Sequence, residues 1–266
     1  MQKQRQAKIE GLFLVLDRRN DKGLEHWCGE LEKRGIPAVI SVDEYTLDNY
    51  NSLVKKIADK GFEVMLGYNG GPFWNTTYDF QYEIMNRMKN KVELCTKKPM
   101  RVFHSKYMAY NEETLKVSDE IGIDYILGRG TAKARAVVYK PEEYKCKIIS
   151  VSNVPSKTMG TGSLCDESLR CRTETPDTLK ELLLNFKEDR MLLVAQTHVS
   201  GVKLQWWNVY QDFFDANMLT WKTLDEFCAR PIVMPNAKIP INTEADYVIP
   251  KPKMPLEQEQ DFPFKG

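Results

Sequence analysis

Several patterns that mark common functional classes are missing from this sequence. No GxGxxG motif follows the first apolar segment, and no GxxxxGK motif ending in Ser or Thr occurs, which argues against a dinucleotide site and a P-loop. No two cysteines form a CxxC pair and the chain has only three histidines, so a structural zinc site is not expected. No apolar run approaches the roughly 20 residues of a membrane-spanning helix.

An excess of charge of one sign is also missing. The 38 Lys and Arg residues balance 37 Asp and Glu residues, which leaves a net charge of +1. A balanced chain gives no electrostatic reason to bind nucleic acid or an anionic membrane surface. We therefore predict no nucleic-acid partner and no membrane span, and the sequence favours no particular oligomeric state.

The N-terminal segment lacks the long apolar region of a signal peptide. In "MQKQRQAKIEGLFLVLD" the apolar part is only "GLFLVL" before Asp17, shorter than the usual region of about 7–15 residues. This pattern is typical of a first strand instead. A native Met1 would keep the protein in the cytoplasm, whereas trimming of a signal peptide would place it in the envelope or outside the cell.

The six cysteines are predicted to be ordinary thiols, and nothing in the sequence indicates a cysteine nucleophile that acts with a histidine. Cys165 and Cys171 flank a short segment of loop composition and could form a disulfide in an oxidising compartment.

What the sequence does contain is the pattern of one large α/β domain. Apolar runs alternate with amphipathic helix patterns over residues 1–230, which predicts parallel strands with helices outside them, as a barrel or a doubly wound sheet. Strands are predicted at about 11–17, 36–42, 62–68, 100–104, 123–128, 135–140, 146–154 and 191–199, and helices at about 23–34, 46–60, 79–95, 111–121, 176–187, 204–218 and 221–230. Residues 155–175 have loop composition, and the Pro-rich extension 231–266 is expected to pack on the surface as an extended strap.

Chemistry in either architecture is expected at the carboxyl ends of the strands. Those ends supply Asp17, Gly67–Gly71, His104–Tyr107, Gly128–Gly130 and His198.

Four stretches of the chain resemble the polysaccharide deacetylase (NodB-homology, carbohydrate esterase) family. "LVKKIADKGFEVMLGYNGGP" is similar to the family segment in which a helix runs into G-H-E-I-x-x-H-x-x-x-H-P, and "AYNEETLKVSDEIGIDYIL" to the stretch after its R-x-P-Y/F-G motif. "FLVLD" stands in the place of its T-F-D-D-G-P strand end, and "LLVAQTH" in the place of its late L-L-H strand. The resemblance covers about 11–200 and implies a distorted (β/α) barrel of the polysaccharide deacetylase type.

The resemblance also implies ancestry among metal-dependent enzymes that remove acetyl groups from N-acetylated sugars. It places Asp17 on the catalytic base and His198 on the late histidine that acts as general acid. The three metal-ligand positions hold Arg18, Gly67 and Gly71, and the glycines are expected to leave room where two imidazoles would reach a metal. No metal or other cofactor is therefore predicted; zinc is expected only if this motif placement is wrong.

A ligand site can still be predicted around the same positions. Arg18 could form an ion pair with Asp17, or it could form an anion or sugar-hydroxyl site with His104 and Lys106. Aromatic side chains at the strand ends could stack on sugar rings or pack in the core. The predicted ligand-binding residues are Arg18, Tyr68, Asn69, Trp74, His104, Lys106, Tyr107 and Arg129.

Three functions fit these residues. The first is a protein with a degenerate metal site that binds a carbohydrate or a small polar or anionic ligand without deacetylating it. The second is a metal-independent enzyme with altered chemistry that uses Asp17, Arg18, His104 and His198. The third is a metal-dependent N-deacetylase of acetamido sugars with a rearranged site.

Overall fold

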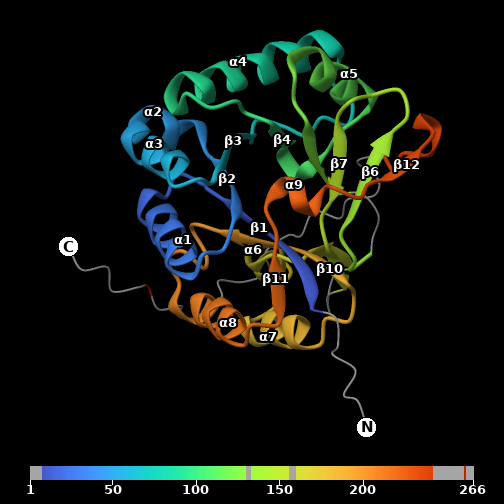
Figure 1. Cartoon of the computed structure of the whole chain (residues 1–266). Coiled ribbons are helices and arrows are strands. Elements are labelled where there is room, and N and C mark those ends of the chain that lie inside the picture. The colour runs from blue at the N-terminus through green and yellow to red at the C-terminus, as the bar shows by residue number, and fades with distance from the viewer. Residues whose placement is uncertain (1–7, 130–132, 156–159, 242–260, 262–266) are drawn as a thin grey trace.

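A curled, mainly parallel sheet forms the centre of the molecule (Figure 1). The structure is a computed structural model that describes residues 8–129, 133–155, 160–241 and 261. The strand order is β10-β1-β2-β3-β4-β5-β7-β6-β12, with β11 paired to the start of β1. Every pairing from β10 to β7 along this order is parallel, β6 pairs antiparallel with β7, and β12 pairs parallel with β6. The predicted α/β class and curled, barrel-type architecture are confirmed.

The strands of the large sheet are β1 (Ile9–Leu16), β2 (Ala38–Val42), β3 (Glu63–Tyr68), β4 (Val102–Ser105), β5 (Tyr125–Gly128), β6 (Val137–Pro141), β7 (Lys147–Ser150), β10 (Arg190–Gln196), β11 (Leu219–Trp221) and β12 (Ile232–Met234). A separate hairpin consists of β8 (Asn153–Pro155) and β9 (Thr161–Ser163).

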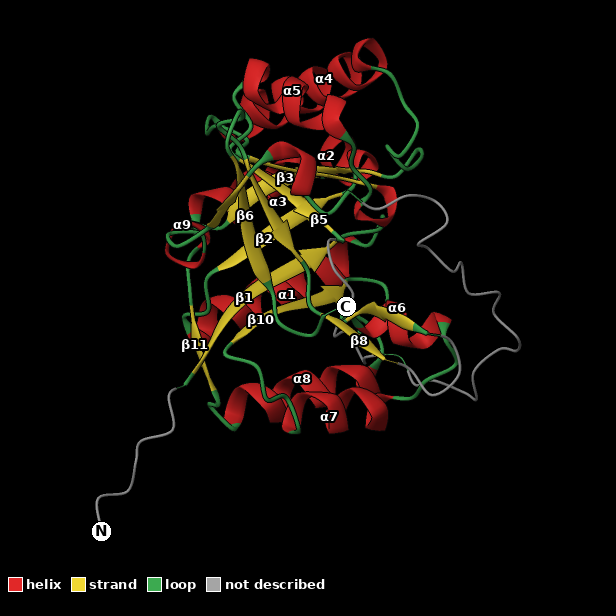
Figure 2. Ribbon diagram, turned by 90° about the vertical axis from the view of Figure 1, so that its right-hand side faces the viewer, coloured by secondary structure: helices red, strands yellow, loops and turns green. Residues whose placement is uncertain are grey.

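Helices cover the outside of the curled sheet, and α7 and α8 lie side by side at one end of it (Figures 1 and 2). They are α1 (Asp21–Arg34), α2 (Glu44–Asn49), α3 (Asn51–Asp59), α4 (Tyr78–Thr96), α5 (Glu112–Ile121), α6 (Asp166–Cys171), α7 (Pro176–Leu184), α8 (Leu204–Asp215) and α9 (Leu224–Phe227), with 3-10 turns η1 (Lys106–Met108) and η2 (Asn236–Lys238). No helix in these ranges is both long and apolar enough to cross a membrane.

Local sequence explains most of these boundaries. The side chain of Asn20 accepts a hydrogen bond from the Gly23 amide at the start of α1, and Gly35 ends the helix in the left-handed conformation with φ 62°. The predicted helix 46–60 is wrong in one respect, because it is two helices that meet at Tyr50, where φ −129° and ψ 40° are not helical. Tyr50 lies between Asn49 and Asn51, and asparagine favours caps and turns over helix interiors.

The irregular middle of the chain holds more structure than its composition predicts. The segment 155–175 contains β9 and the short helix α6, so the prediction of loop throughout is wrong. A helix this short is not stable alone, and contacts with the rest of the chain decide its formation. From the predicted C-terminal extension, Ile232–Met234 joins the sheet as β12; residues 242–260 and 262–266 lie outside the described residues.

Candidate functional site

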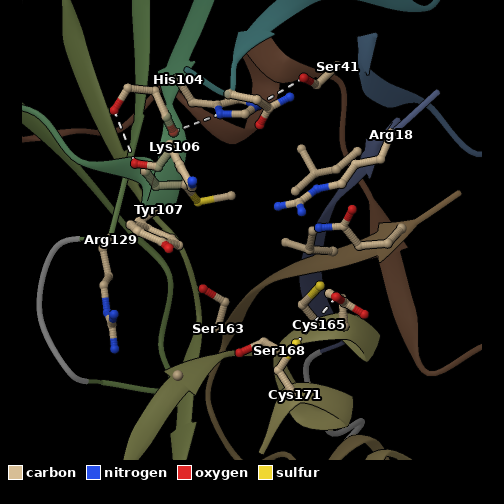
Figure 3. A pocket seen from close by; sticks show the side chains of 18 of the residues that line it. Arg18, Ser41, His104, Lys106, Tyr107, Arg129, Ser163, Cys165, Ser168 and Cys171 are labelled. Carbon is tan, nitrogen blue, oxygen red and sulfur yellow. Dashed lines mark hydrogen bonds between the residues drawn. The ribbon is translucent and has the colours of Figure 1, made fainter. Parts of the chain in front are cut away.

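A cavity of about 360 Å³ opens at the carboxyl ends of β1, β4 and β5, with α6 and the β8–β9 hairpin forming the opposite wall (Figure 3). Most of the residues singled out from the sequence line it: Asp17, Arg18, Asn69, His104, Lys106, Tyr107 and Arg129. Three others, Tyr68, Trp74 and His198, are not among the lining residues. The parallel sheet thus brings together side chains that are far apart in the sequence, as expected for this class of fold.

Asp17 follows β1 and is almost fully buried, with 3% of its surface exposed. Its Oδ1 accepts hydrogen bonds from the hydroxyl of Thr197 (2.9 Å) and the amide of Asn20 (3.1 Å), and its Oδ2 accepts from the amide of Asp43 (3.2 Å). The carboxylate therefore holds three chain segments together at the end of β1. Three donors from the protein thus bind the carboxylate oxygens.

Arg18 does not form the ion pair with Asp17 that was one of the two predicted roles. Its backbone amide donates to the Thr197 hydroxyl (3.2 Å), which is already bonded to Asp17. Its guanidinium lines the cavity, is exposed to solvent, and forms no ion pair or hydrogen bond with any residue that the structure describes. The positive charge of Arg18 is therefore available to a ligand.

His104, the third residue of β4, is buried and uses both ring nitrogens. Its Nδ1 lies 3.0 Å from the carbonyl oxygen of Ser105, which can only accept a hydrogen bond, so Nδ1 carries the proton. Its Nε2 then accepts from the hydroxyl of Ser41, 2.8 Å away on β2. Burial, with a smaller contribution from the positive charge of Arg18, lowers the pKa of His104 to about 4. The ring is neutral at physiological pH and links β2 to β4.

The two glycines at the predicted metal-ligand positions differ sharply in their surroundings. A Cβ atom added at Gly67 would lie 2.5 Å from His104 Nε2 and 2.6 Å from Ser41 Oγ, whereas one added at Gly71 meets nothing within 4 Å. The expectation that both glycines leave room is therefore wrong for Gly67. The His104 ring, which stands opposite Gly67 in the register of β3 and β4, occupies that space.

The side chains at these positions do not fit a bound metal ion. Arg18 brings a fixed positive charge, Gly71 brings no donor, and a larger residue at position 67 would collide with the His104–Ser41 pair. Across the described ranges, no group of three or more His, Cys, Asp or Glu side chains is placed to hold a metal.

The buried, neutral state of His104 predicts a pH dependence of stability. Its pKa is about 4 in the folded state against 6.5 for an ordinary histidine, so between these values the unfolded chain binds the extra proton. The free energy of unfolding should fall by about 3 kcal/mol from this group as the pH drops from neutral to about 4. Urea unfolding of the wild type and of His104→Gln across this range measures the effect. The variant should lose less stability on acidification; parallel curves would show that His104 does not titrate in this way.

His198 lies behind the cavity wall rather than in it. Its Nε2 is 3.5 Å from Oε2 of Glu167, and the other oxygen of that carboxylate accepts from the thiol of Cys171 at 3.3 Å. Burial raises the pKa of Glu167, but His198, Cys171 and Arg170 together outweigh it and leave the pKa lowered. The structure therefore pairs His198 with Glu167, not with Asp17.

The predicted aromatic residues form a packed group beside the cavity. The rings of Trp74 and Tyr107 stack with centroids 6.0 Å apart, and Tyr68 packs on Phe73 at 5.3 Å. Tyr107 has a left-handed backbone (φ 62°), which non-glycine residues adopt rarely, and η1 holds it at the cavity with Lys106. Of these rings, only that of Tyr107 is placed to touch a ligand in the cavity.

The α6 wall is the part of the site that sequence reasoning missed. Ser163, Cys165, Glu167, Ser168 and Cys171 line the cavity, and this stretch has neither helical periodicity nor a recognisable motif. Both cysteines are free, and burial raises the pKa of Cys171 to about 11.

The same helix argues against the disulfide predicted as an alternative. Cys165 and Cys171 stand at the two ends of α6, six positions apart, and a helical rise of about 1.5 Å per residue separates them by about 9 Å along its axis. A disulfide needs Cα atoms within about 7 Å, so a bridge would require the helix to unwind.

Comparison with known proteins places this site on a known fold. The polysaccharide deacetylase family model matches residues 8–126. A solved structure of a probable polysaccharide deacetylase from Pseudomonas aeruginosa is similar with a TM-score of 0.64 and 9% identity, covering 84% of this chain and 91% of that chain. A peptidoglycan deacetylase from Bacillus subtilis has a TM-score of 0.55 and 11% identity, covering 83% of this chain and 90% of that chain.

A third similar structure is a CE4 family pseudoenzyme from Bacillus anthracis, with a TM-score of 0.56 and 11% identity over 86% of this chain and 68% of that chain. Among curated proteins, no sequence matches this chain. The predicted resemblance is thus confirmed: residues 8–126 match the polysaccharide deacetylase family, and the chain has the α/β fold of that family's solved structures.

Proposed function

We propose that this polysaccharide-deacetylase-like protein has lost the metal site of its family and binds a small carbohydrate or other polar ligand that bears an anionic group, without deacetylating it. The observation that carries the proposal is the guanidinium of Arg18, which forms no ion pair with any described residue and lines the cavity at one of the positions where the family resemblance places a metal ligand. A guanidinium repels a metal cation, and its planar donors match the two oxygens of a carboxylate or phosphate.

Two further features support binding without metal chemistry. The space that a ligand side chain at position 67 would need is filled by His104 and Ser41, which are hydrogen-bonded to each other. A similar fold occurs in a protein named as a CE4 family pseudoenzyme, of which a mutant with restored enzymatic activity has also been solved.

The alternative of a metal-independent enzyme is less well supported by the geometry. Asp17 is committed to two backbone amides and a hydroxyl, and His104 has a hydrogen bond at each ring nitrogen. His198 faces Glu167 outside the cavity lining. None of the three is placed to exchange a proton with a molecule in the cavity without giving up these partners.

Binding of a sugar acid should depend on Arg18. We expect D-gluconate to bind the wild type in isothermal titration calorimetry and neutral D-glucitol, with the same carbon chain, to bind much more weakly. Arg18→Met should weaken gluconate binding about tenfold or more, since a charge-assisted hydrogen bond contributes about 1.5–3 kcal/mol. The matched control is Arg19→Met, because the Arg19 guanidinium is 3.7 Å from Asp43 and does not line the cavity.

Equal losses in both arginine variants would attribute the effect to general charge and contradict a specific site at Arg18. Metal analysis and acetate release from N-acetylglucosamine oligomers complete the test. Stoichiometric zinc together with acetate release would overturn the proposal in favour of a metal-dependent deacetylase.

A further inference from the structure

The cavity presents two cationic side chains, Arg18 and Lys106, that no carboxylate of the described residues neutralises. Arg18 follows β1 and Lys106 follows β4, two strands that are separated by β2 and β3 in the sheet. Figure 3 shows the two side chains on facing sides of the cavity. Within the described ranges neither forms an ion pair or a side-chain hydrogen bond, and the Lys106 ammonium lies 5.4 Å from the centroid of the Tyr107 ring.

Each acidic side chain of the described cavity lining already contacts protein groups. Asp17 is 3% exposed and accepts three hydrogen bonds from the protein. Glu167 is held between His198 and Cys171. Because both carboxylates already contact protein groups, the charges left to a ligand are the positive ones on two sides of the cavity. Arg129, whose guanidinium donates to the carbonyl of Thr161 (3.0 Å), adds a third positive charge on the Lys106 side.

The space between the two cations suits a small hydroxylated body. A cavity of about 360 Å³ is at the lower end of the roughly 300–1,000 Å³ found for small-molecule sites. Its remaining walls are rich in hydroxyl and amide groups, which include Asn69, Ser163 and Ser168. A chain of about six carbons with hydroxyl groups meets these requirements of size and polarity.

We infer that the ligand carries two anionic groups, one held by Arg18 and the other by Lys106, on a sugar-sized body. This inference rests on the proposed function and adds to it the number and placement of the charges. Two separated cations favour a dianion over a monoanion. When the spacing of the two anionic groups matches that of the two cations, each charge–charge contact contributes independently to the free energy of binding.

A matched series of six-carbon probes tests the inference by calorimetry: neutral D-glucitol, singly charged D-gluconate and doubly charged D-glucarate. We expect glucarate to bind at least tenfold tighter than gluconate. Arg18→Met and Lys106→Met should each reduce glucarate affinity to about that of gluconate, and Arg19→Met should leave it unchanged. A sugar monophosphate and the corresponding bisphosphate form a second arm, which distinguishes a phosphate ligand from a carboxylate ligand.

The outcomes distinguish failure of this inference from failure of the proposed function. If gluconate binds as tightly as glucarate, and the sugar monophosphate as tightly as its bisphosphate, the inference of two anionic groups is wrong while an anion site at Arg18 stands. If glucarate binds tightly but Lys106→Met has no effect, the second group is not at Lys106 and the inference is overturned. If no charged probe binds better than glucitol, both proposals fail.

Discussion

Gly67→Ala should destabilise the protein strongly, while Gly71→Ala should be close to neutral. The added methyl group at position 67 would lie 2.5 Å from His104 Nε2 and 2.6 Å from Ser41 Oγ, closer than real Cβ atoms approach such neighbours. Both neighbours are buried and hydrogen-bonded to each other, so neither can move without losing that bond. Overpacking of this kind costs about 1–3 kcal/mol, and we expect the upper end.

The measurement is the free energy of unfolding by urea for each variant. Gly71→Ala is the matched control, because Gly71 lies four residues after Gly67, in the loop that follows β3, and its Cβ would meet nothing within 4 Å; a change of about 0.5 kcal/mol or less is expected. His104→Ala removes the ring that would collide, so the double variant Gly67→Ala/His104→Ala should lose less stability than the two single losses added together. Additive losses would show that the His104 ring does not occupy this space.

The same collision sets a condition for rebuilding a metal site. Restoring the family pattern at positions 18, 67 and 71 alone puts a histidine at 67 where the His104 ring stands. We therefore expect the triple variant Arg18→Asp/Gly67→His/Gly71→His to bind no stoichiometric zinc unless His104 is also replaced by a small residue.

The sequence predicts the strand ends that form the site better than it predicts the side-chain contacts within the site. The strand ends could be found because buried parallel strands and amphipathic helices have clear periodicities, and Asp17, Arg18 and Lys106 follow such strands directly. Periodicity could not predict that the His104 ring fills the space at Gly67, because this contact depends on the register of two strands and on a side-chain rotamer. Once β3 and β4 are paired, Gly67 and His104 stand opposite each other.

The wall formed by α6 could not be predicted for a different reason. Within α6 the buried residues are only Leu169 and a polar one, Asp166, so the helix has no apolar stripe that periodicity would reveal. Burial raises the pKa of Asp166, and hydrogen bonds from Ser200, Gln196 and Glu167 oppose that rise. A lone aspartate in a stretch of loop composition gives no sequence signal of this role.

Replacing Asp166 should therefore have one of the largest effects on stability in this chain. Its oxygens accept from the amides of Gln196 (3.1 Å), Glu167 (2.7 Å) and Ser200 (3.2 Å), and from the Ser200 hydroxyl. Asp166→Ala leaves these buried donors without an acceptor, and each unsatisfied donor costs about 1–3 kcal/mol. We expect a loss of at least about 3 kcal/mol in the free energy of unfolding.

Asp166→Asn separates the loss of hydrogen-bond acceptors from the loss of volume. An amide has nearly the same shape as a carboxylate, but its nitrogen donates hydrogen bonds and cannot accept them. In Asp166→Asn this nitrogen would therefore lie against protein groups that are themselves donors. We expect Asp166→Asn to be almost as destabilising as Asp166→Ala, and Asp177→Asn, at the exposed first turn of α7, to cost less than about 1 kcal/mol. In hydrogen exchange, the amides of α6 should lose protection first, and gluconate binding should weaken with them because α6 forms one wall of the cavity. If Asp166→Asn keeps full stability and α6 protection, the helix is held by its apolar contacts instead, and Asp166 does not position this wall.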